Sequence, residues 1–394
     1  MTVLAPDVVL DESGVRRGCA VSIGDGVIDA VFDEAPPAAE RLEGIALAPG
    51  FVNAHSHAFQ RDLRGRVERP GDFWSWRDEM YRLAATLDPE SIHDVSRRCF
   101  AQMRRAGYTS VCEFHYVHHR PDGTPYDEPN ELAHAVCEAA EAERLRITLL
   151  LVAYERGGEP RFRDPDVETF LGRVEALRVW AERRELVSVG VAPHSVRAVA
   201  REWLERLAAI DLPLHVHADE QPREIDECVA EHGLRPIELL ADTGVLSERT
   251  TVVHATHANA CEVELLAASG AAVCLCPTTE GNLGDGLPPT AELAAARVPL
   301  AIGSDSNVRL DPLEELREVE TVARRVAQKR SVLDVPTLLR AGWTARLEVG
   351  APADLVALDL RNDALAGVVD EDLAAALVFA GDASAVVRTW VAGF

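Results

Sequence analysis

The middle of the chain repeats one pattern, in which a short apolar run is followed by a longer segment whose apolar residues recur every three or four positions. The short runs have the length of strands, and the longer segments have the period of amphipathic helices. Strands are predicted at 51–57, 109–114, 147–153, 187–192, 214–217, 251–254, 272–276 and 300–303. Helices are predicted at 131–145, 165–185 and 199–209, and another begins at Asp88-Pro89 and ends at Gly107. Eight such units predict an α/β fold, the parallel (β/α)8 or TIM barrel, whose functional residues lie at the C-terminal ends of the strands.

The two ends of the chain follow a different pattern. Residues 1–47 alternate between apolar and polar positions and turn at glycines, which is typical of short antiparallel hairpins. The same alternation returns at 353–359 and 386–391. We therefore expect a barrel domain over residues 48–344 and a small β-domain built from residues 1–47 together with 345–394.

Polar side chains gather where the predicted strands end. His55 and His57 close the first strand, and because they are two residues apart they point to the same face. Other strands end in Glu113 and His115, His194, His215 and His217, His254 and His257, and Asp305. Of the 13 histidines, only His93, His134 and His232 fall away from strand ends or the loops after them. Paired histidines can also be hydrogen-bonded core residues, but imidazoles and carboxylates collected at one end of a barrel predict a metal centre.

Composition narrows the class of partner. The 394 residues are 47% hydrophobic and 27% charged, and no apolar run approaches the roughly 20 residues of a membrane span. The first residues lack the pattern of a secretory signal, and the eight cysteines lie in apolar runs, as reduced thiols of a cytoplasmic protein do. A net charge of -25 argues against nucleic acid or an anionic membrane as a partner, so a small anionic substrate would need local arginines.

Several motifs carry a family resemblance. The segments Pro49-Gly-Phe-Val-Asn-Ala-His-Ser-His57, His217-Ala-Asp-Glu220, His254-Ala-Thr-His257 and Gly303-Ser-Asp305 resemble the amidohydrolase superfamily. More narrowly, Phe73-Trp-Ser-Trp-Arg77, Glu113-Phe-His-Tyr-Val-His-His119 and His194-Ser-Val-Arg197 resemble the formimidoylglutamate deiminase family of histidine degradation. The resemblance covers about residues 45–330 and implies hydrolysis of N-formimino-L-glutamate to N-formyl-L-glutamate and ammonia. Two alternatives stay open, a deaminase of a heterocyclic amine or of N-formimino-L-aspartate, and a non-catalytic binding module.

The resemblance implies a metal site with His55, His57, His217 and Asp305 as ligands. His217 is preferred to His215 because Glu220 follows it by three residues, as in the family; His215 would be a hydrogen-bonded core residue. For Asp305 the alternative role is a helix cap. The strand that carries a bridging lysine in two-metal relatives ends here at His194, which favours one divalent metal. Zinc is implied by the resemblance, and imidazole with carboxylate ligation also permits iron or manganese.

The resemblance also assigns catalytic roles. Asp305 would accept a proton from the attacking water, and Glu220 would act as general acid and base, delivering a proton to the leaving nitrogen. His254 would hydrogen-bond the attacking water or the developing charge, with a core histidine as the alternative reading. His257 fits that core role better.

A dicarboxylate substrate needs cationic and hydrogen-bonding partners. The resemblance implies Arg77 and Arg197 for the carboxylates, with Gln60, Tyr116 and His194 as hydrogen-bonding companions. For each arginine a surface salt bridge is the alternative. Arg77 is expected in a loop, and the stretch with Gly281, Gly284 and Gly286 is expected to be a loop that lines the pocket. A homodimer is expected by analogy with the family.

Overall fold

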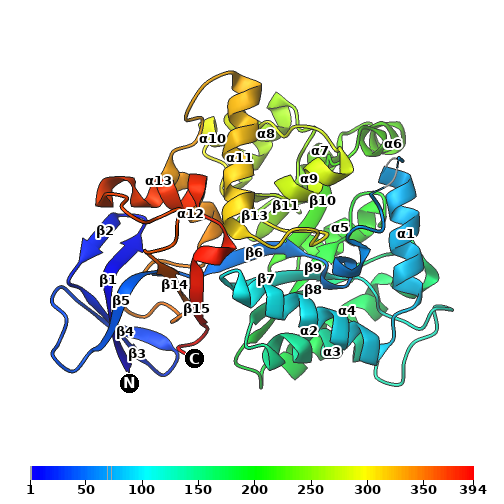
Figure 1. Ribbon diagram of the computed structural model, residues 1–394. Helices are drawn as coiled ribbons and strands as arrows, with labels where there is room; N and C mark the ends of the chain where they lie inside the picture. The colour runs from blue at the N-terminus through cyan, green and yellow to red at the C-terminus, as the bar shows by residue number, and fades with distance from the viewer. Residues whose placement is uncertain (1, 69, 72) are drawn as a thin grey trace.

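The computed structural model describes residues 2–68, 70–71 and 73–394, and it contains a barrel with a second sheet beside it (Figure 1). The barrel sheet has eight parallel strands in the order β13-β12-β11-β10-β9-β8-β7-β6. Its strands are β6 (Phe51–Ser56), β7 (Tyr108–His115), β8 (Arg146–Ala153), β9 (Val187–Pro193), β10 (Leu214–Ala218), β11 (Thr250–His254), β12 (Ala272–Leu275) and β13 (Leu300–Ile302). These are the eight predicted strands, so the predicted barrel is confirmed.

The barrel closes between its first and last strands, at the residues of the predicted metal site. Ser56 and Asp305 form an isolated parallel bridge. The His57 amide donates to the Asp305 carbonyl at 2.9 Å, and the Asp305 amide donates to the His55 carbonyl at 2.9 Å. Gly303 permits this approach, because a Cβ atom there would lie 2.8 Å from the Cβ atom of His55. The contact between the first and last strands of the barrel therefore brings His55 and His57 next to Asp305.

Helices and short 3-10 turns surround the strands (Figure 1). The helices are α1 (Phe73–Ala85), α2 (Pro89–Arg105), α3 (Glu131–Ala142), α4 (Val167–Ala181), α5 (Arg201–Ala208), α6 (Pro222–His232), α7 (Pro236–Asp242), α8 (Ala260–Ser269), α9 (Pro277–Leu283), α10 (Thr290–Ala295), α11 (Pro312–Ala327), α12 (Val335–Gly342) and α13 (Asp370–Ala380). The 3-10 turns are η1 (Ala58–Leu63), η2 (Pro160–Phe162) and η3 (Ala383–Ala385).

Helix α2 shows how local sequence sets an element's bounds. Its N-cap Asp88 accepts a hydrogen bond from the Ser91 amide at 2.8 Å, and the Ser91 hydroxyl accepts one from the Asp88 amide at 2.8 Å. Pro89 follows at the first helical position, where its missing N–H costs nothing. The predicted apolar face is buried against the barrel: Ile92, Val95, Cys99 and Met103.

The second sheet joins both ends of the chain. Its strands are β1 (Thr2–Asp11), β2 (Gly14–Arg17), β3 (Ala20–Gly24), β4 (Val27–Phe32), β5 (Glu40–Pro49), β14 (Leu355–Asp359) and β15 (Val386–Trp390). The pairs β1/β2 and β3/β4 are antiparallel hairpins, as predicted, whereas β5 runs parallel to β1, which the hairpin prediction missed. The domain bounds at 47/48 and 344/345 stay a prediction.

No helix among the described residues is long and apolar enough to cross a membrane. All eight cysteines are free, and six of them are buried.

Candidate metal centre and substrate pocket

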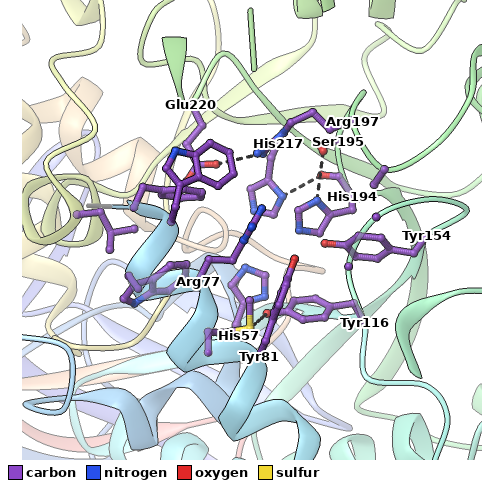
Figure 2. Close-up of a pocket in the computed structure, with 18 of the residues that line it drawn as sticks. His57, Arg77, Tyr81, Tyr116, Tyr154, His194, Ser195, Arg197, His217 and Glu220 are labelled. Carbon is purple, nitrogen blue, oxygen red and sulfur yellow. Dashed lines mark hydrogen bonds and ion pairs between the residues drawn. The ribbon is translucent and has the colours of Figure 1, made fainter. Parts of the chain in front are cut away.

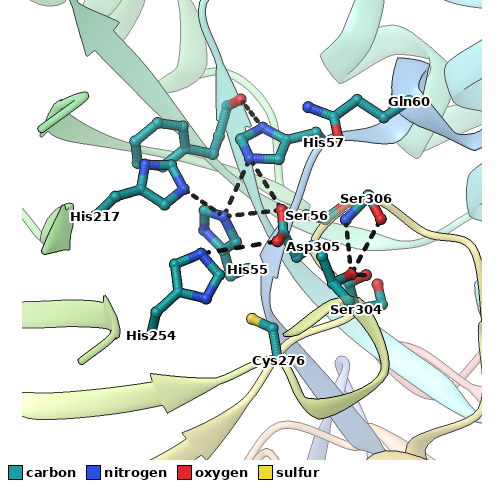
Figure 3. Close-up of polar contacts among 12 residues, drawn as sticks. His55, Ser56, His57, Gln60, His217, His254, Cys276, Ser304, Asp305 and Ser306 are labelled. Atoms are coloured by element: carbon teal, nitrogen blue, oxygen red, sulfur yellow. Dashed lines mark hydrogen bonds and ion pairs between the residues drawn. The ribbon is translucent and has the colours of Figure 1, made fainter. Parts of the chain in front are cut away.

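Three histidine side chains face one another at the C-terminal end of the barrel (Figure 3). His55 comes from β6, His57 follows the end of that strand as the residue before η1, and His217 comes from β10 across the barrel. The Nε2 atom of His55 lies 3.2 Å from that of His57 and 3.0 Å from that of His217. All three rings are buried. The structure thus brings together the three predicted imidazole ligands.

For two of these histidines, His57 and His217, the other ring nitrogen indicates the tautomer. The Nδ1 atom of His57 lies 3.0 Å from the Phe114 carbonyl oxygen, and Nδ1 of His217 lies 2.9 Å from the His194 carbonyl oxygen. A carbonyl oxygen only accepts, so each Nδ1 carries the proton and each Nε2 presents a lone pair. Lone pairs that face one another in a buried site repel unless a cation lies among them. The donor set therefore fits a divalent metal.

Asp305 lies beside the imidazoles, where the metal prediction placed it. Its Oδ1 atom is 3.3 Å from the Nε2 atom of His57 and 3.6 Å from that of His55. Burial opposes ionisation of Asp305, but the two imidazoles outweigh it and hold the pKa of Asp305 well below its usual range. Burial lowers the pKa of His55 to about 4, so that its ring is neutral at pH 7. A neutral imidazole beside a carboxylate is the ligand combination that catalytic zinc sites use.

Glu220 and His254 lie at the same end of the barrel. The Nε2 atom of His254 is 3.7 Å from the Glu220 Oε1 atom and 3.8 Å from the Asp305 Oδ2 atom. Burial raises the pKa of Glu220. Burial would lower the pKa of His254, but the carboxylates of Glu220, Glu280 and Asp305 raise it well above its ordinary value. A carboxyl group that holds a proton more firmly than usual is suited to general acid and base chemistry.

The backbone is strained at two of these positions. His254 has a φ of 74° and Asp305 has a φ of 45°. Positive φ is costly for a residue with a Cβ atom, and such residues cluster at functional sites. Both lie where a barrel strand ends, so the strain coincides with the predicted catalytic groups.

A cavity of about 200 Å³ opens above these groups (Figure 2). Its floor includes His57, His217, His254, Glu220 and Asp305. Its walls carry aromatic side chains from several segments: Phe73, Trp74, Trp76, Tyr81, Tyr116 and Tyr154. All five predicted substrate-binding residues also line it: Gln60, Arg77, Tyr116, His194 and Arg197. The structure therefore gathers the predicted catalytic and substrate-binding residues around one cavity.

Arg77 belongs to helix α1, and the prediction that it lies in a loop was wrong. The first residues of α1 are an aromatic run, so apolar spacing gave no clear helical period there. The Arg77 guanidinium lies 4.6 Å from the ring centroid of Trp74 and 5.3 Å from that of Tyr81. Its Nε atom is buried without a hydrogen-bond partner among the described residues. Arg77 thus presents a cation to the cavity that is held by aromatic faces.

Arg197 already has acidic neighbours. Its Nη2 atom is 3.6 Å from Glu220 Oε2, and its Nε atom is 3.4 Å from Glu224 Oε1. Burial opposes its charge, but Glu224 and Glu220 outweigh it and raise the pKa of Arg197. The sequence-based alternative of a surface salt bridge does not apply, because the Arg197 side chain is only 19% exposed.

The remaining predicted residues form hydrogen bonds along one side of the cavity. The Gln60 Nε2 atom donates to the Tyr116 hydroxyl at 2.8 Å, and the Tyr116 hydroxyl lies 3.2 Å from the Met80 sulfur. The Gln60 Oε1 atom has no partner among the described residues. The His194 Nδ1 atom lies 3.3 Å from the Ser195 hydroxyl. Gln60 therefore keeps an acceptor available.

The sequence did not reveal the role of Glu280, which lies behind His254. Its Oε1 atom is 3.2 Å from His254 Nδ1 and accepts a hydrogen bond from the Cys276 amide at 2.9 Å. His254, Cys276 and Glu280 could also hold a metal by their spacing, although Glu280 is already engaged by the other two. The sequence feature that could have indicated this role is the position of Glu280, four residues after Cys276, a cysteine at the end of a predicted strand.

Two smaller predictions need correction. The stretch expected to be a pocket-lining loop begins as helix α9, and its residue in the cavity wall is Leu283 instead of a glycine. His215 is buried as expected, but its Nδ1 atom has no hydrogen-bond partner among the described residues. His257 makes a hydrogen bond within the fold, because its Nε2 atom lies 2.8 Å from the Asp285 carbonyl oxygen.

Comparison with known proteins places this site in a family context. The model of the amidohydrolase family matches residues 46–394. The chain is 38% identical to the formimidoylglutamate deiminase of Pseudomonas aeruginosa over 99% of its own length and 93% of the relative's. Its fold superposes with a TM-score of 0.93 on the crystal structure of an amidohydrolase from Brucella melitensis (35% identity, 100% and 94% of the two chains). An adenosine deaminase from Xanthomonas campestris with bound zinc gives a TM-score of 0.86 (27% identity, 100% and 92%).

Proposed function

Because the chain belongs to the amidohydrolase family and is a hydrolase acting on carbon–nitrogen bonds, we propose that it converts N-formimino-L-glutamate and water into N-formyl-L-glutamate and ammonia. The observation that carries the proposal is Arg77, whose guanidinium enters the cavity above the imidazoles without an ion pair to any described carboxylate. A cation with no ion pair among the described residues, in so acidic a chain, suits an anionic substrate. The identity to the Pseudomonas aeruginosa deiminase supports the same substrate.

The residues that would hold one divalent metal are His55, His57, His217 and Asp305. A divalent metal held there would lower the pKa of water toward neutrality and so supply hydroxide as the nucleophile. Zinc is the proposed ion, in line with the zinc-containing adenosine deaminase structure, and iron or manganese suits the same donors.

The chain's own groups move the protons. Asp305 accepts a proton as water adds to the amidine carbon of the formimino group. Glu220, whose pKa burial raises, donates a proton to the terminal imino nitrogen, which leaves a hydroxyl and an amino group on the carbon. The Glu220 carboxylate then moves the hydroxyl proton to the amino nitrogen, the bond from carbon to that nitrogen breaks, and ammonia leaves as the carbonyl forms. The proton held by Asp305 returns to Glu220 and restores both groups. His254, 3.7 Å from Glu220, hydrogen-bonds the attacking oxygen and stabilises the charge that develops on it.

Two arginines that line the cavity hold the substrate's carboxylates. Arg77 binds one carboxylate, and Arg197 binds the other while it keeps its contact with Glu224. Gln60, Tyr116 and His194 supply hydrogen bonds to the chain between the formimino group and the carboxylates. Such a substrate would place the protein in histidine degradation. By analogy with the family, we also propose that the protein is cytoplasmic and forms a homodimer.

One alternative has support of its own. The aromatic cavity wall and the 27% identity to an adenosine deaminase favour a heterocyclic amine as the second candidate. N-formimino-L-aspartate, the other alternative, is N-formimino-L-glutamate with a side chain one methylene shorter. Recognition by arginine separates the candidates, because a neutral heterocycle does not need Arg77 or Arg197.

The test is an ammonia-release assay of the zinc-loaded protein with N-formimino-L-glutamate, N-formimino-L-aspartate and adenosine. We expect kcat/KM to be highest for N-formimino-L-glutamate and to fall about 100-fold in Arg77→Met and in Arg197→Met, since each loses a charged hydrogen-bond pair. The matched control is Arg206→Met, which removes an exposed arginine paired with Glu168 and should change little. Preferred turnover of adenosine, with no loss in either pocket variant, would overturn the proposal.

A further inference from the structure

The 3-10 turn η2 lies between three segments that wall the cavity: helix α1, the end of β7 with the residues after it, and the end of β8. Its central residue, Arg161, is the largest fully buried side chain described, with 1% of its surface exposed. It forms no ion pair with a described carboxylate, so its charge is balanced in another way. A buried cation is costly unless all its donors are used.

The Arg161 guanidinium donates to main-chain carbonyls from two of these segments. It donates to the carbonyls of Ala84 and Leu87, the latter at 2.8 Å, at the C-terminal end of α1. Its Nε atom donates to the His119 carbonyl, beyond β7, at 3.1 Å. The Arg161 carbonyl in turn accepts from the amides of His118 and His119 at 3.1 and 3.0 Å. The C-terminal end of a helix carries partial negative charge, which suits a cation.

The neighbouring residue, Phe162, contacts a tyrosine from each of the three segments. Its ring centroid lies 5.6 Å from that of Tyr81 in α1, 5.0 Å from that of Tyr116 after β7, and 5.7 Å from that of Tyr154 after β8. Each of these tyrosines lines the cavity, and Figure 2 shows the three rings around the same space. The aromatic contacts of η2 therefore reach all three walls, and its polar contacts reach two of them, the end of α1 and the segment after β7.

We propose that Arg161 is a positioning residue for substrate binding, which fixes the end of α1 against the segment after β7 and thereby holds Arg77, Tyr81 and Tyr116 in register around the cavity. The inference rests on the proposed function for its substrate. An apolar side chain of similar volume could fill the same space, but it could not hold main-chain carbonyls of α1 and of the segment after β7 at once. Neither Arg161 nor Phe162 contacts a metal-facing imidazole in the described part of the chain, and the link to the metal centre runs through Tyr116, whose ring centroid lies 5.3 Å from that of His57. We therefore expect substrate binding to change more than the metal centre.

The test compares Arg161→Met and Arg161→Lys with Arg104→Met. Arg104 is a matched control, because its guanidinium also donates to main-chain carbonyls, those of Glu143 at 3.0 Å and Thr389 at 3.2 Å, away from the cavity. In Arg161→Met we expect KM for N-formimino-L-glutamate to rise about 10- to 100-fold, with metal content unchanged and kcat changed less than KM. Arg161→Lys, which keeps the charge and some of the donors, should lie between this variant and the wild type. Arg104→Met should leave KM unchanged.

A second readout does not depend on the substrate. Hydrogen exchange of the α1 amides, residues 73–85, should become faster in Arg161→Met and stay unchanged in Arg104→Met. Unchanged exchange in α1, or an equal rise of KM in the two methionine variants, would overturn the proposal. If the wild type does not turn over N-formimino-L-glutamate, the proposed function fails, while faster exchange in α1 alone would still support the positioning role. If Arg161→Met does not fold, Arg161→Lys decides by the same two measurements.

Discussion

The Nδ1 atom of His217 lies 2.9 Å from the carbonyl oxygen of His194, so one residue serves two parts of the site. The His194 main chain orients a metal-facing imidazole, while the His194 ring lines the cavity. A hydrogen bond of this kind fixes both the tautomer and the direction of a metal ligand. A substitution of the His194 side chain can therefore change substrate binding without changing metal binding.

Substitution of His194 by alanine should leave the metal in place. The backbone carbonyl that holds His217 is retained, whereas the ring that faces the substrate is lost. We expect metal content equal to the wild type and kcat/KM for N-formimino-L-glutamate lower by about 10-fold or more, the cost of one hydrogen bond to a charged group. Elemental analysis and steady-state kinetics measure the two effects. Loss of the metal in His194→Ala would contradict the separation.

Glu220→Gln tests the proposed proton donor. Glutamine has nearly the same shape but cannot exchange a proton, so we expect kcat to fall by about 100- to 10,000-fold with little change in KM or metal content. The proposed role would be wrong if the variant kept more than about a tenth of the wild-type kcat.

Removal of the metal should abolish activity and lower the melting temperature, because the facing Nε2 atoms of His55, His57 and His217 then lose the cation that compensates their lone pairs. Dialysis against a chelator removes the metal, and adding zinc afterwards should restore both the activity and the melting temperature. Cys276→Ala is the matched control, because Cys276 belongs to the second possible ligand set with His254 and Glu280. Equal metal content in Cys276→Ala and the wild type supports the first set; loss of metal in that variant points to the second.

The cap of helix α2 gives a prediction for pH. Hydrogen bonds from the Ser91 hydroxyl and amide hold the pKa of Asp88 below its ordinary value. A carboxylate with a depressed folded-state pKa stabilises the protein above its unfolded-state pKa, and the contribution is lost as the pH falls through the folded value. Asp88→Ala should therefore lower the free energy of unfolding by about 1 kcal/mol at neutral pH and by less near pH 3. Thermal unfolding across this range measures the difference. Asp88→Asn, which keeps an acceptor at every pH, should restore most of the loss, and a difference that does not change with pH would refute the ionic cap.

Much of the barrel could be predicted from the sequence because its strands are continuous apolar runs that end in polar residues. The parity of His55 and His57 was enough to direct both rings to one point. Closure was harder to foresee, since it depends on contacts between residues at opposite ends of the barrel sequence, such as Gly303 against His55.

Other features carried a misleading local signal or none. The aromatic start of α1 hid its helical period, and Arg77 was therefore expected in a loop. Arg161 stands in Pro160-Arg-Phe-Arg163, which resembles an exposed charged turn, yet the fold buries its guanidinium among carbonyls from distant segments. Burial of a charged group depends on the tertiary arrangement of its acceptors, which no spacing pattern records.

A formimino group has two carbon–nitrogen bonds, and the bond that breaks tests the proposed chemistry most directly. The measurement is a carbon NMR time course of the zinc-loaded protein with N-formimino-L-glutamate labelled at the formimino carbon, with ammonia quantified in parallel. Proton delivery by Glu220 to the terminal nitrogen predicts labelled N-formyl-L-glutamate with one ammonia for each substrate consumed. Labelled formamide with free glutamate, or no conversion by the metal-loaded protein, would contradict it.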